Sequence, residues 1–445
     1  MKRRTFFRAA VETGVLAAGG LPLSCTLAGK SANTVRITDI EGMSLDALHK
    51  ELHTELFDIF LPIMDKWVID REYGGFMCNA RCDGVHTNMN KRTWYEGRGI
   101  WVYSFLYNTM DRSPKHLEVV RKSVEFILKT APPKNTLWGA WFTREGKQIG
   151  GQDTDIYSDI FVAEGLQEYA KATGDTRYLD MAKEIVLKMM DIYDNSPEYQ
   201  PAISNTMAAA GAKLPLGSRI LGHWMLTFRL IFQMLQKRPD PQLEEIAARC
   251  QDAFMNKHYN PEYGLFNEYR NHDFSPMKDE VFRDYCVGHG HEGLWMIMEK
   301  AVQDKDKKLF DTCAERLKRM IEVFWDDVYG GEFQILTNVD KNQWEMSKTL
   351  WLHTEILIGT MMVIEHTGAD WAKFWFARNQ RYIRDKLDLR NYNYQGWMLF
   401  PDRKATFDPN YDRICNFHKP RQLMLNLLAI ERIQKRGGKT SGIFG

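Results

Sequence analysis

The feature that most constrains this chain is an internal repeat. An aromatic residue, followed by one or two small residues and then by Phe or Trp, marks each copy. The copies begin at Tyr73, Trp138, Tyr263, Tyr329 and Tyr394, with a degenerate copy at Tyr199. The lead aromatics are 65, 61, 64, 66 and 65 residues apart. So regular a period indicates one supersecondary unit copied six times, with room for two helices and a hairpin in each copy.

Each unit contains two stretches with helical periodicity. In the first unit, Trp94, Arg98 and Trp101 fall on one face of the first stretch. Gly174 and Gly368 stand three periods apart, each where a left-handed residue ends a helix. We therefore predict that every unit is a helical hairpin.

Two further helices lack a partner inside a unit. One is the apolar helix near residues 45–67, and the other is the last helix, near residues 412–435. Pairing them closes the circle, whereas an open solenoid would keep both of its ends polar. The predicted fold is all-α: one domain over residues 45–436, a closed toroid with an inner and an outer ring and short β-hairpins at one end.

The segments outside the toroid have separate predictions. Arg3-Arg4 precedes an apolar stretch over residues 9–23, the layout of a twin-arginine export signal within residues 1–30. That stretch is too short to span a bilayer. Cys25 follows an imperfect lipoprotein cleavage box, so the expected location is the periplasm, either soluble or lipid-anchored at Cys25. Residues 31–44 are predicted to be a linker and residues 437–445 a flexible tail.

Charge and motifs exclude several classes of partner. The 59 basic and 58 acidic residues nearly cancel, which gives no support to a nucleic-acid partner. No complete Gly-x-x-x-x-Gly-Lys-Ser/Thr phosphate-binding loop occurs, because Gly29-Lys30-Ser31 and Gly438-Lys439-Thr440 both lack its first glycine, and no cofactor is expected.

Residues suited to chemistry gather at the beginning of the first helix of each unit. Equivalent positions in a closed ring point to one axis, so they are predicted to line a common pocket. They are Trp94 and Arg98, Tyr157 and Asp159, His223, His289 and Glu292, Trp351 and Glu355, and His418 and Arg421.

The segment from Gly288 to Glu292 contains two histidines and a glutamate, so a metal site must be considered. His289 and His291 are two residues apart and diverge by about 200° on a helix, so they point to opposite sides. His289 and Glu292, three apart, share a face. No HExxH motif is present. A His–Glu pair in a polar cleft suits proton transfer, and we predict no metal site.

Three motifs resemble the N-acylglucosamine 2-epimerase family over roughly residues 45–435. They are Gly288-His289-x-x-Glu292-x-x-Trp295, Leu350-Trp351-x-His353-x-Glu355 and Phe417-His418-Lys419-Pro420-Arg421. Supporting segments are Lys91-x-x-Trp94-x-x-x-Arg98-x-x-Trp101 and the turn Tyr73-Gly74-Gly75-Phe76. The resemblance implies a six-hairpin α/α barrel, an isomerase acting on sugars, and a homodimer formed through outer helices.

The resemblance also implies the reaction. His289 and His418 match the family's general acid and base, which exchange the C2 proton of an opened aldose and thereby invert C2. Removing a proton next to an aldehyde also needs a partner for the enediolate oxygens. We assign that role to Arg98, whose structural alternative is an ion pair with a carboxylate of the ring.

The remaining candidates have two interpretations each. Glu292 tunes His289 or forms a cap or salt bridge, and Glu355 binds sugar hydroxyls or positions His418. Trp94 and Trp351 offer apolar faces to a sugar or belong to the core. The other expected substrate-binding residues are Tyr157, Asp159, Arg421 and His223; the last is matched by a histidine in cellobiose-epimerising relatives, although its neighbours depart from their pattern.

Several reactions remain open. The expected substrate is a free mono- or disaccharide of the N-acetylglucosamine/N-acetylmannosamine or glucose/mannose type. The alternatives are an aldose–ketose isomerase or a cellobiose 2-epimerase on the same site. A glycoside hydrolase would need two of Asp153, Asp155 and Asp159 as a carboxylate pair, and a non-catalytic carbohydrate-binding protein would leave the histidines without a role.

Overall fold

The computed structural model describes residues 34–445, apart from 82, 154, 197–198, 202, 204–206, 208–210 and 393–412. The predicted export signal, Cys25 and the motif copy at Tyr394 lie outside the described residues. No described helix is long and apolar enough to cross a membrane.

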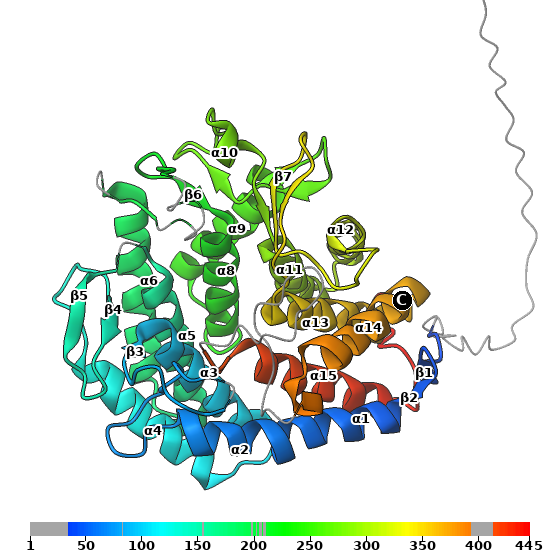
Figure 1. Cartoon of the computed structure of the whole chain (residues 1–445), viewed down its shortest axis with the longest axis horizontal. Coiled ribbons are helices and arrows are strands. Elements are labelled where there is room, and N and C mark those ends of the chain that lie inside the picture. Colours follow the sequence, from blue (N-terminus) through cyan, green and yellow to red (C-terminus); the bar gives the residue numbers. More distant parts are fainter. Residues whose placement is uncertain are drawn as a thin grey trace, which may run out of the picture.

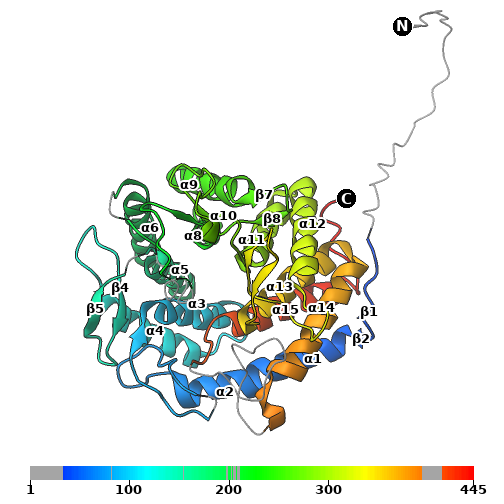
Figure 2. The ribbon, with the colours of Figure 1, turned by 45° about the horizontal axis from the view of Figure 1, so that its top comes forward.

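Helices form two concentric rings (Figures 1 and 2). The described inner helices are α3 (Thr93–Thr109), α5 (Tyr157–Thr173), α8 (Leu221–Leu235), α11 (His289–Asp304), α13 (Leu350–Thr367) and α15 (His418–Lys435). Each is paired with an outer helix: α4 (Pro114–Lys129), α6 (Arg177–Asn195), α9 (Pro241–Asp252), α12 (Lys307–Phe324), α14 (Asp370–Tyr382) and, for α15, α1 (Leu45–Thr54).

The ring closes as predicted. Inner neighbours contact one another in the order α3, α5, α8, α11, α13, α15, and α15 contacts α3. Helix α1 packs outside α15, so the first and last helices form the sixth hairpin. Helix α1 continues through η1 (Glu55–Phe60), α2 (Leu61–Ile63) and η2 (Met64–Val68). The predicted six-hairpin α/α toroid is confirmed.

Burial differs between the rings for a geometric reason. Inner helix α8 is buried from Leu221 to Met234, because an inner helix touches two inner neighbours, an outer partner and the axis. Outer helix α12 buries one stripe only, which includes Phe310, Leu317 and Phe324. Gly174 and Gly368 end α5 and α13 in the left-handed conformation, with φ of 75° and 70°, as predicted.

Short strands gather between the helices. Strands β3 (Lys91–Arg92), β6 (Arg219–Ile220) and β10 (Cys286–Val287) each run directly into an inner helix. Their partners form the sheets β3-β4-β5, β6-β9 and β10-β11-β12. The other strands are β1 (Asp39–Ile40), β2 (Met43–Ser44), β4 (Gly139–Phe142), β5 (Gln148–Gln152), β7 (Tyr259–Asn260), β8 (Leu265–Phe266), β9 (Tyr269–Arg270), β11 (Ile335–Asn338) and β12 (Gln343–Glu345). The remaining helical segments are η3 (Ala253–Lys257), α10 (Glu280–Arg283), η4 (Ile383–Leu387) and η5 (Leu389–Tyr392).

The predicted linker and tail differ from expectation. Within 31–44, Ile37 and Ile40 are buried and residues 39–44 form the β1–β2 hairpin. In the tail, Thr440 donates its backbone N–H to Val35, and the Phe444 ring lies 4.9 Å from the Phe310 ring. Apolar side chains and backbone hydrogen bonds therefore tie both segments to the barrel.

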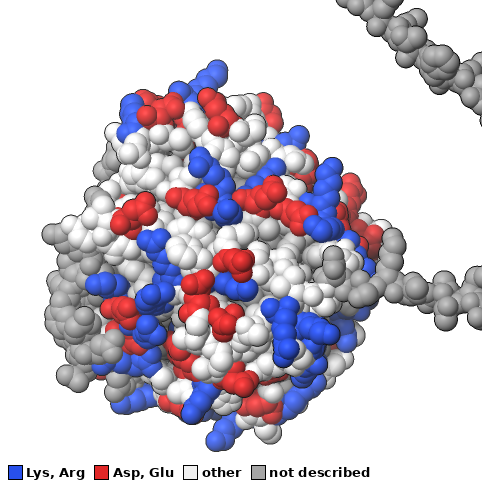
Figure 3. All heavy atoms as spheres, turned by 90° about the vertical axis from the view of Figure 1, so that its right-hand side faces the viewer, with Lys and Arg blue, Asp and Glu red and all other residues white. Residues whose placement is uncertain are grey.

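The surface agrees with the balanced composition. On the face shown in Figure 3, basic and acidic side chains are intermixed, without a broad field of one sign. This pattern gives no footprint for a polyanion on that face.

Candidate active site

A cavity of about 470 Å³ opens where the inner helices begin. Its lining comes from the six inner helices and from the loops and strands that precede them. Of the predicted site residues, the cavity is lined by Trp94, Arg98, Tyr157, His289, Glu292, Trp351 and His418. The predicted convergence on one pocket is therefore correct for these seven.

His289, the first residue of α11, is held by a carboxylate that was not predicted from the sequence. Its Nδ1 lies 2.9 Å from Glu268 Oε1. A carboxylate only accepts hydrogen bonds, so Nδ1 carries the proton and Nε2 is the ring's reactive nitrogen. Burial opposes the charged ring, but the charge and hydrogen bond of Glu268 outweigh it and raise the pKa of His289.

Close packing fixes the other side of this ring. A Cβ on Gly222 would lie 2.2 Å from the Tyr157 hydroxyl and 2.9 Å from His289 Cε1. Only glycine leaves room for both groups at this point of α8.

His418, the first residue of α15, has the opposite electrostatic environment. Its Nδ1 lies 2.9 Å from Glu355 Oε1, and that oxygen also accepts a hydrogen bond from Arg421 Nη2 at 2.7 Å. Burial, followed by the positive charge of Arg98, holds the pKa of His418 well below its usual range. The ring is therefore neutral at pH 7, with its Nε2 lone pair unprotonated.

Trp351 brings the two imidazoles together. Its ring centroid lies 5.6 Å from that of His289 and 5.6 Å from that of His418. Both histidines line the same cavity, and both contact one indole. This arrangement places a base and an acid within reach of one sugar bound over Trp351.

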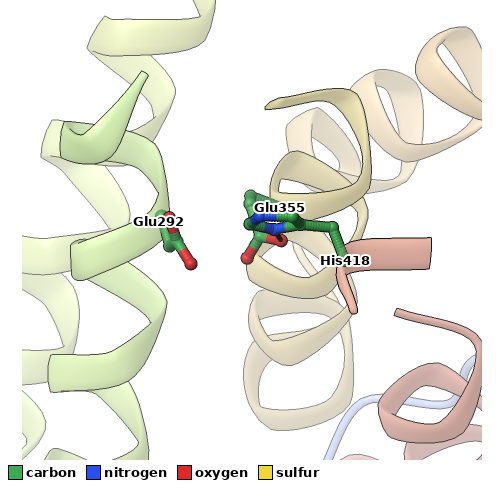
Figure 4. A group of neighbouring side chains, drawn as sticks. All are labelled: Glu292, Glu355 and His418. Carbon is green, nitrogen blue, oxygen red and sulfur yellow. Dashed lines mark hydrogen bonds and ion pairs between the residues drawn. The ribbon is translucent and has the colours of Figure 1, made fainter. Parts of the chain in front are cut away.

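A buried charge network lies behind His418. Figure 4 shows Glu292, Glu355 and His418 converging from α11, α13 and α15. Ligand atoms of these three lie within 4.8 Å of one another, as in a metal site. However, Arg421 Nη2 lies 2.5 Å from Glu292 Oε1 and 2.7 Å from Glu355 Oε1. The guanidinium supplies the positive charge that this set of donors requires.

Arg98 faces the cavity without a carboxylate partner among the described residues. Its guanidinium lies 4.0 Å from the Phe161 ring and 5.5 Å from the Trp94 ring. Burial, followed by repulsion from Arg413, lowers the pKa of Arg98 to about 10. The alternative of a structural ion pair is not what the structure shows, and the charge is available to an anionic intermediate.

Two predicted substrate-binding residues point elsewhere. Asp159 accepts a hydrogen bond from the Trp138 backbone and forms a 2.5 Å ion pair with Lys188. His223 is buried behind Tyr157, with ring centroids 4.4 Å apart. Asp159 is two residues after Tyr157, which lines the cavity, and therefore points about 200° away from it. His223 also lies 5.5 Å from the Tyr193 ring of outer helix α6, and neither residue lines the cavity.

Glu292 and Glu355 each follow the second of their two interpretations, a salt bridge for Glu292 and the positioning of His418 for Glu355. Glu292 binds Arg421 directly and contacts His289 only as a more distant charge, because Glu268 takes the hydrogen bond. Glu355 does position His418, which was one of its two interpretations. Neither Glu355 nor Arg421 lines the cavity, so both act through His418 and Glu292.

Three charged residues of the cavity were not predicted from the sequence. They are Arg92, Glu268 and Arg413. A signal existed for Glu268, which follows the motif Tyr263-Gly264-Leu265-Phe266 by two residues. For Arg413 none existed, because it belongs to an irregular segment.

Known proteins are similar to this chain in sequence and fold. A family model described as N-acylglucosamine 2-epimerase (GlcNAc 2-epimerase) matches residues 74–406. The N-acylglucosamine 2-epimerase of Bos taurus is 26% identical over 313 residues, which cover 67% of this chain and 71% of that protein. The cellobiose 2-epimerase of Dictyoglomus turgidum is 22% identical over 406 residues, covering 86% and 98% of the two chains.

A solved structure carries the same architecture. The cellobiose 2-epimerase from Bacillus thermoamylovorans superposes with a TM-score of 0.73 at 18% identity, covering 87% of this chain and 100% of that one. The family match extends over most of the chain and includes His289, Glu292, Trp351 and Glu355. The chain therefore belongs to the N-acylglucosamine 2-epimerase family.

Proposed function

We propose that this sugar 2-epimerase inverts C2 of a free aldose by proton exchange between its two pocket histidines. The observation that carries the proposal is the pair of opposite pKa shifts of His289 and His418, which both contact Trp351 in one cavity. Two titratable groups whose pKa values are pushed apart in one cavity suit an acid and a base.

His418 is the base. Its proton on Nδ1 is held by Glu355, so Nε2 is free to accept the C2 proton of the open-chain aldehyde. The electron pair of the broken C2–H bond moves into an enediolate, which places negative charge on the oxygen at C1. Arg98 faces this charge, and its guanidinium can bind both enediolate oxygens.

His289 is the acid. With its pKa raised, it delivers a proton from Nε2 to the opposite face of C2, which inverts that carbon. One turnover leaves a proton on His418 and removes one from His289. Exchange with solvent resets both rings, so the proton that arrives at C2 originates from water.

Proton exchange in heavy water tests this function. We expect deuterium at C2 of the epimer formed from glucose, N-acetylglucosamine or cellobiose, read by NMR. Deuterium at C1 of an aldose formed from a ketose would instead identify an aldose–ketose isomerase. Release of a new reducing end from an oligosaccharide would identify a hydrolase.

Two substitutions test the assignment of the residues. His289→Ala and His418→Ala should each abolish turnover and leave thermal unfolding nearly unchanged. His116→Ala, on an outer helix and paired with Asp111, is the matched control and should retain activity. Turnover in either pocket variant would remove that histidine from the mechanism.

We also propose that the protein is exported, on the strength of the Arg3-Arg4 signal. Cell fractionation should find the wild type in the periplasm and an Arg3→Lys, Arg4→Lys variant in the cytoplasm. Labelling with a radioactive fatty acid, with Cys25→Ala as control, tests the lipid anchor. Sedimentation of the purified protein tests the homodimer.

A further inference from the structure

Arg92 is an unexplained cation of the cavity. It is the last residue of β3 and the N-cap of α3, where Ser, Thr, Asp or Asn is preferred. Its side chain makes no capping hydrogen bond, and a positive charge at a helix N-terminus is disfavoured by the helix dipole. The helix therefore gives no structural reason for an arginine here.

No ion pair explains Arg92 either. Among the described residues, no carboxylate lies within ion-pair distance of its guanidinium, and its buried Nε has no hydrogen-bond partner. Two fully buried guanidiniums of this barrel are paired: Arg421 with Glu292, and Arg229 with Glu164. A half-buried guanidinium without a partner is costly unless a ligand supplies the opposite charge.

Aromatic stacking orients this guanidinium. It lies 4.0 Å from the Trp94 ring and 5.3 Å from the ring of Trp141, its neighbour across β3 and β4. A guanidinium stacked on an indole keeps its N–H edge free for bidentate hydrogen bonds. Because Arg92 and Trp94 both line the cavity, that edge is available to a bound sugar.

Three guanidiniums lie along the wall around Arg92. Arg413 and Arg92 lie 5.3 and 5.9 Å from the same Tyr95 ring, and Arg98 lies six residues after Arg92, on α3. Each acidic residue that lines the cavity accepts a hydrogen bond or forms an ion pair. Glu268 binds His289, Glu292 binds Arg421, and Asp153 and Asp155 accept hydrogen bonds from Ser158 and the Tyr157 backbone.

Two guanidiniums contact Trp94 from different surroundings. Its ring centroid lies 4.0 Å from Arg92 and 5.5 Å from Arg98. Arg98 also lies 5.0 Å from the Phe417 ring, next to His418, whereas Arg92 lies 5.3 Å from the Trp141 ring on β4. In the proposed reaction Arg98 faces the oxygens at C1 and C2. Arg92 is therefore placed for a group at the other end of the sugar.

We propose that Arg92 determines specificity for an anionic sugar, one that carries a carboxylate or phosphate group remote from C2. The proposal rests on the proposed function, because it places C2 beside Arg98 and the two histidines. It narrows the substrate class from free aldoses in general to uronic acids, oligosaccharides containing them, or sugar phosphates.

Matched sugars test the proposal. The pairs are glucose with glucuronic acid, glucose with glucose 6-phosphate, and cellobiose with its glucuronic acid analogue, each followed by deuterium incorporation at C2. We expect the anionic member of at least one pair to have a kcat/KM about 10- to 100-fold higher, the range for a charge-assisted hydrogen bond. The carboxylate and phosphate members identify which group is recognised.

Variants locate the effect. In Arg92→Gln the ratio of kcat/KM for anionic and neutral sugar should fall to about one, and Arg92→Lys should retain part of it. Arg121→Gln, on the exposed face of α4, changes the net charge equally and should keep the wild-type ratio. The proposal is overturned if the neutral sugar is equal or better in every pair, or if Arg92→Gln keeps the wild-type preference.

Binding separates this inference from the proposed function. Calorimetry with the same sugars does not depend on turnover. If no sugar exchanges its C2 proton but the anionic members bind more tightly in an Arg92-dependent way, the epimerase proposal fails and the charge recognition stands. If C2 exchange occurs without any charge preference, only the inference about Arg92 fails.

Discussion

The two pocket histidines, His289 and His418, favour opposite protonation states because the charges around them differ. His289 has the carboxylate of Glu268 beside Nδ1, which outweighs both burial and the charge of Arg98, so its protonated form is favoured. The carboxylate beside His418 is shared with Arg421, and Arg98 lies near, so its neutral form is favoured. The pair is therefore differentiated by charges outside the two rings.

The first prediction concerns Glu268→Gln. The amide keeps a hydrogen bond to His289 Nδ1 but loses the charge that raises the pKa of this ring. The acid must be protonated, so activity falls as the pH rises through that pKa. The alkaline limb of kcat/KM should therefore move to lower pH. If the pKa of His289 falls by about one, kcat/KM at any pH above the limb falls about tenfold.

The acidic limb provides an internal control, because it reports the deprotonation of His418, and it should stay in place. Glu262→Gln, on the exposed turn before β8, should leave both limbs unchanged. An alkaline limb that does not move in Glu268→Gln would show that His289 is not the acid.

The second prediction concerns Arg421→Met. This change leaves the buried Glu292 and Glu355 without their shared cation. Breaking a buried charge network by removing one partner costs about 3–5 kcal/mol in free energy of unfolding, measured by chemical denaturation. Arg384→Met, exposed on η4, should cost less than about 0.5 kcal/mol. Equal stability of the two variants would contradict the network.

At the residue scale, part of the candidate site could be predicted from the sequence. The 200° argument that separated His289 from His291 also applies to Tyr157 and Asp159, and it would have excluded Asp159 from the pocket. Glu268 could not be placed beside His289, because the contact crosses from the β8–β9 connection to α11. Pairing of charges across units depends on side-chain geometry that periodicity does not encode.

At the scale of elements, side chains at the start of the inner helices accept hydrogen bonds from the loops that carry the repeat motif. The backbone N–H groups of Phe76, Trp138 and Glu332 donate to Glu96, Asp159 and His353, each at the third or fourth position of an inner helix. A polar side chain at this position therefore anchors the loop that contains the repeat motif. Residues in the same first helical turn that point to the axis remain free to bind substrate.

The third prediction follows for Asp159→Asn. The amide oxygen can still accept from Trp138, but the ion pair with Lys188 is lost. We expect the free energy of unfolding to fall by about 1–3 kcal/mol, while both limbs of the pH profile remain. Asp191→Asn, exposed on α6, should be neutral for stability. A displaced limb in Asp159→Asn would place this carboxylate in the chemistry after all.

Helices were easier to predict than their connections. The apolar face of α3 and the glycines that end α5 and α13 are local signals. The sheets are not local: β3 pairs with β4 across α3 and α4, and β6 pairs with β9 across α8 and α9. Two-residue strands of this kind have too little sequence pattern to be recognised.

For the whole molecule, closure depends on α1. Leu48 and Leu52 of α1 are fully buried, and α1 covers α15, which begins with His418. The sequence predicted this pairing because two apolar helices lacked partners. It missed the order in the tail, where isolated contacts such as Phe444 with Phe310 show no period.

The fourth prediction tests closure. Leu52→Ala should lower the free energy of unfolding by about 2–5 kcal/mol, the cost of a core cavity, and the barrel should still unfold in one transition. His53→Ala, the exposed neighbour on the same helix, is the control and should change stability little. A separate early transition of α1 would show that this helix is an appendage rather than a member of the ring.

The segments that begin and end the described barrel lie side by side. Val35 donates its backbone N–H to Thr440 Oγ1 at 3.0 Å, and Ile37 donates to Gly438 at 2.6 Å. Because these two segments are adjacent, the same barrel can in principle form from a chain that begins at a different hairpin. A circular permutant with residues 34 and 445 joined by a short linker, and new ends opened between α6 and α8, should assemble the same pocket.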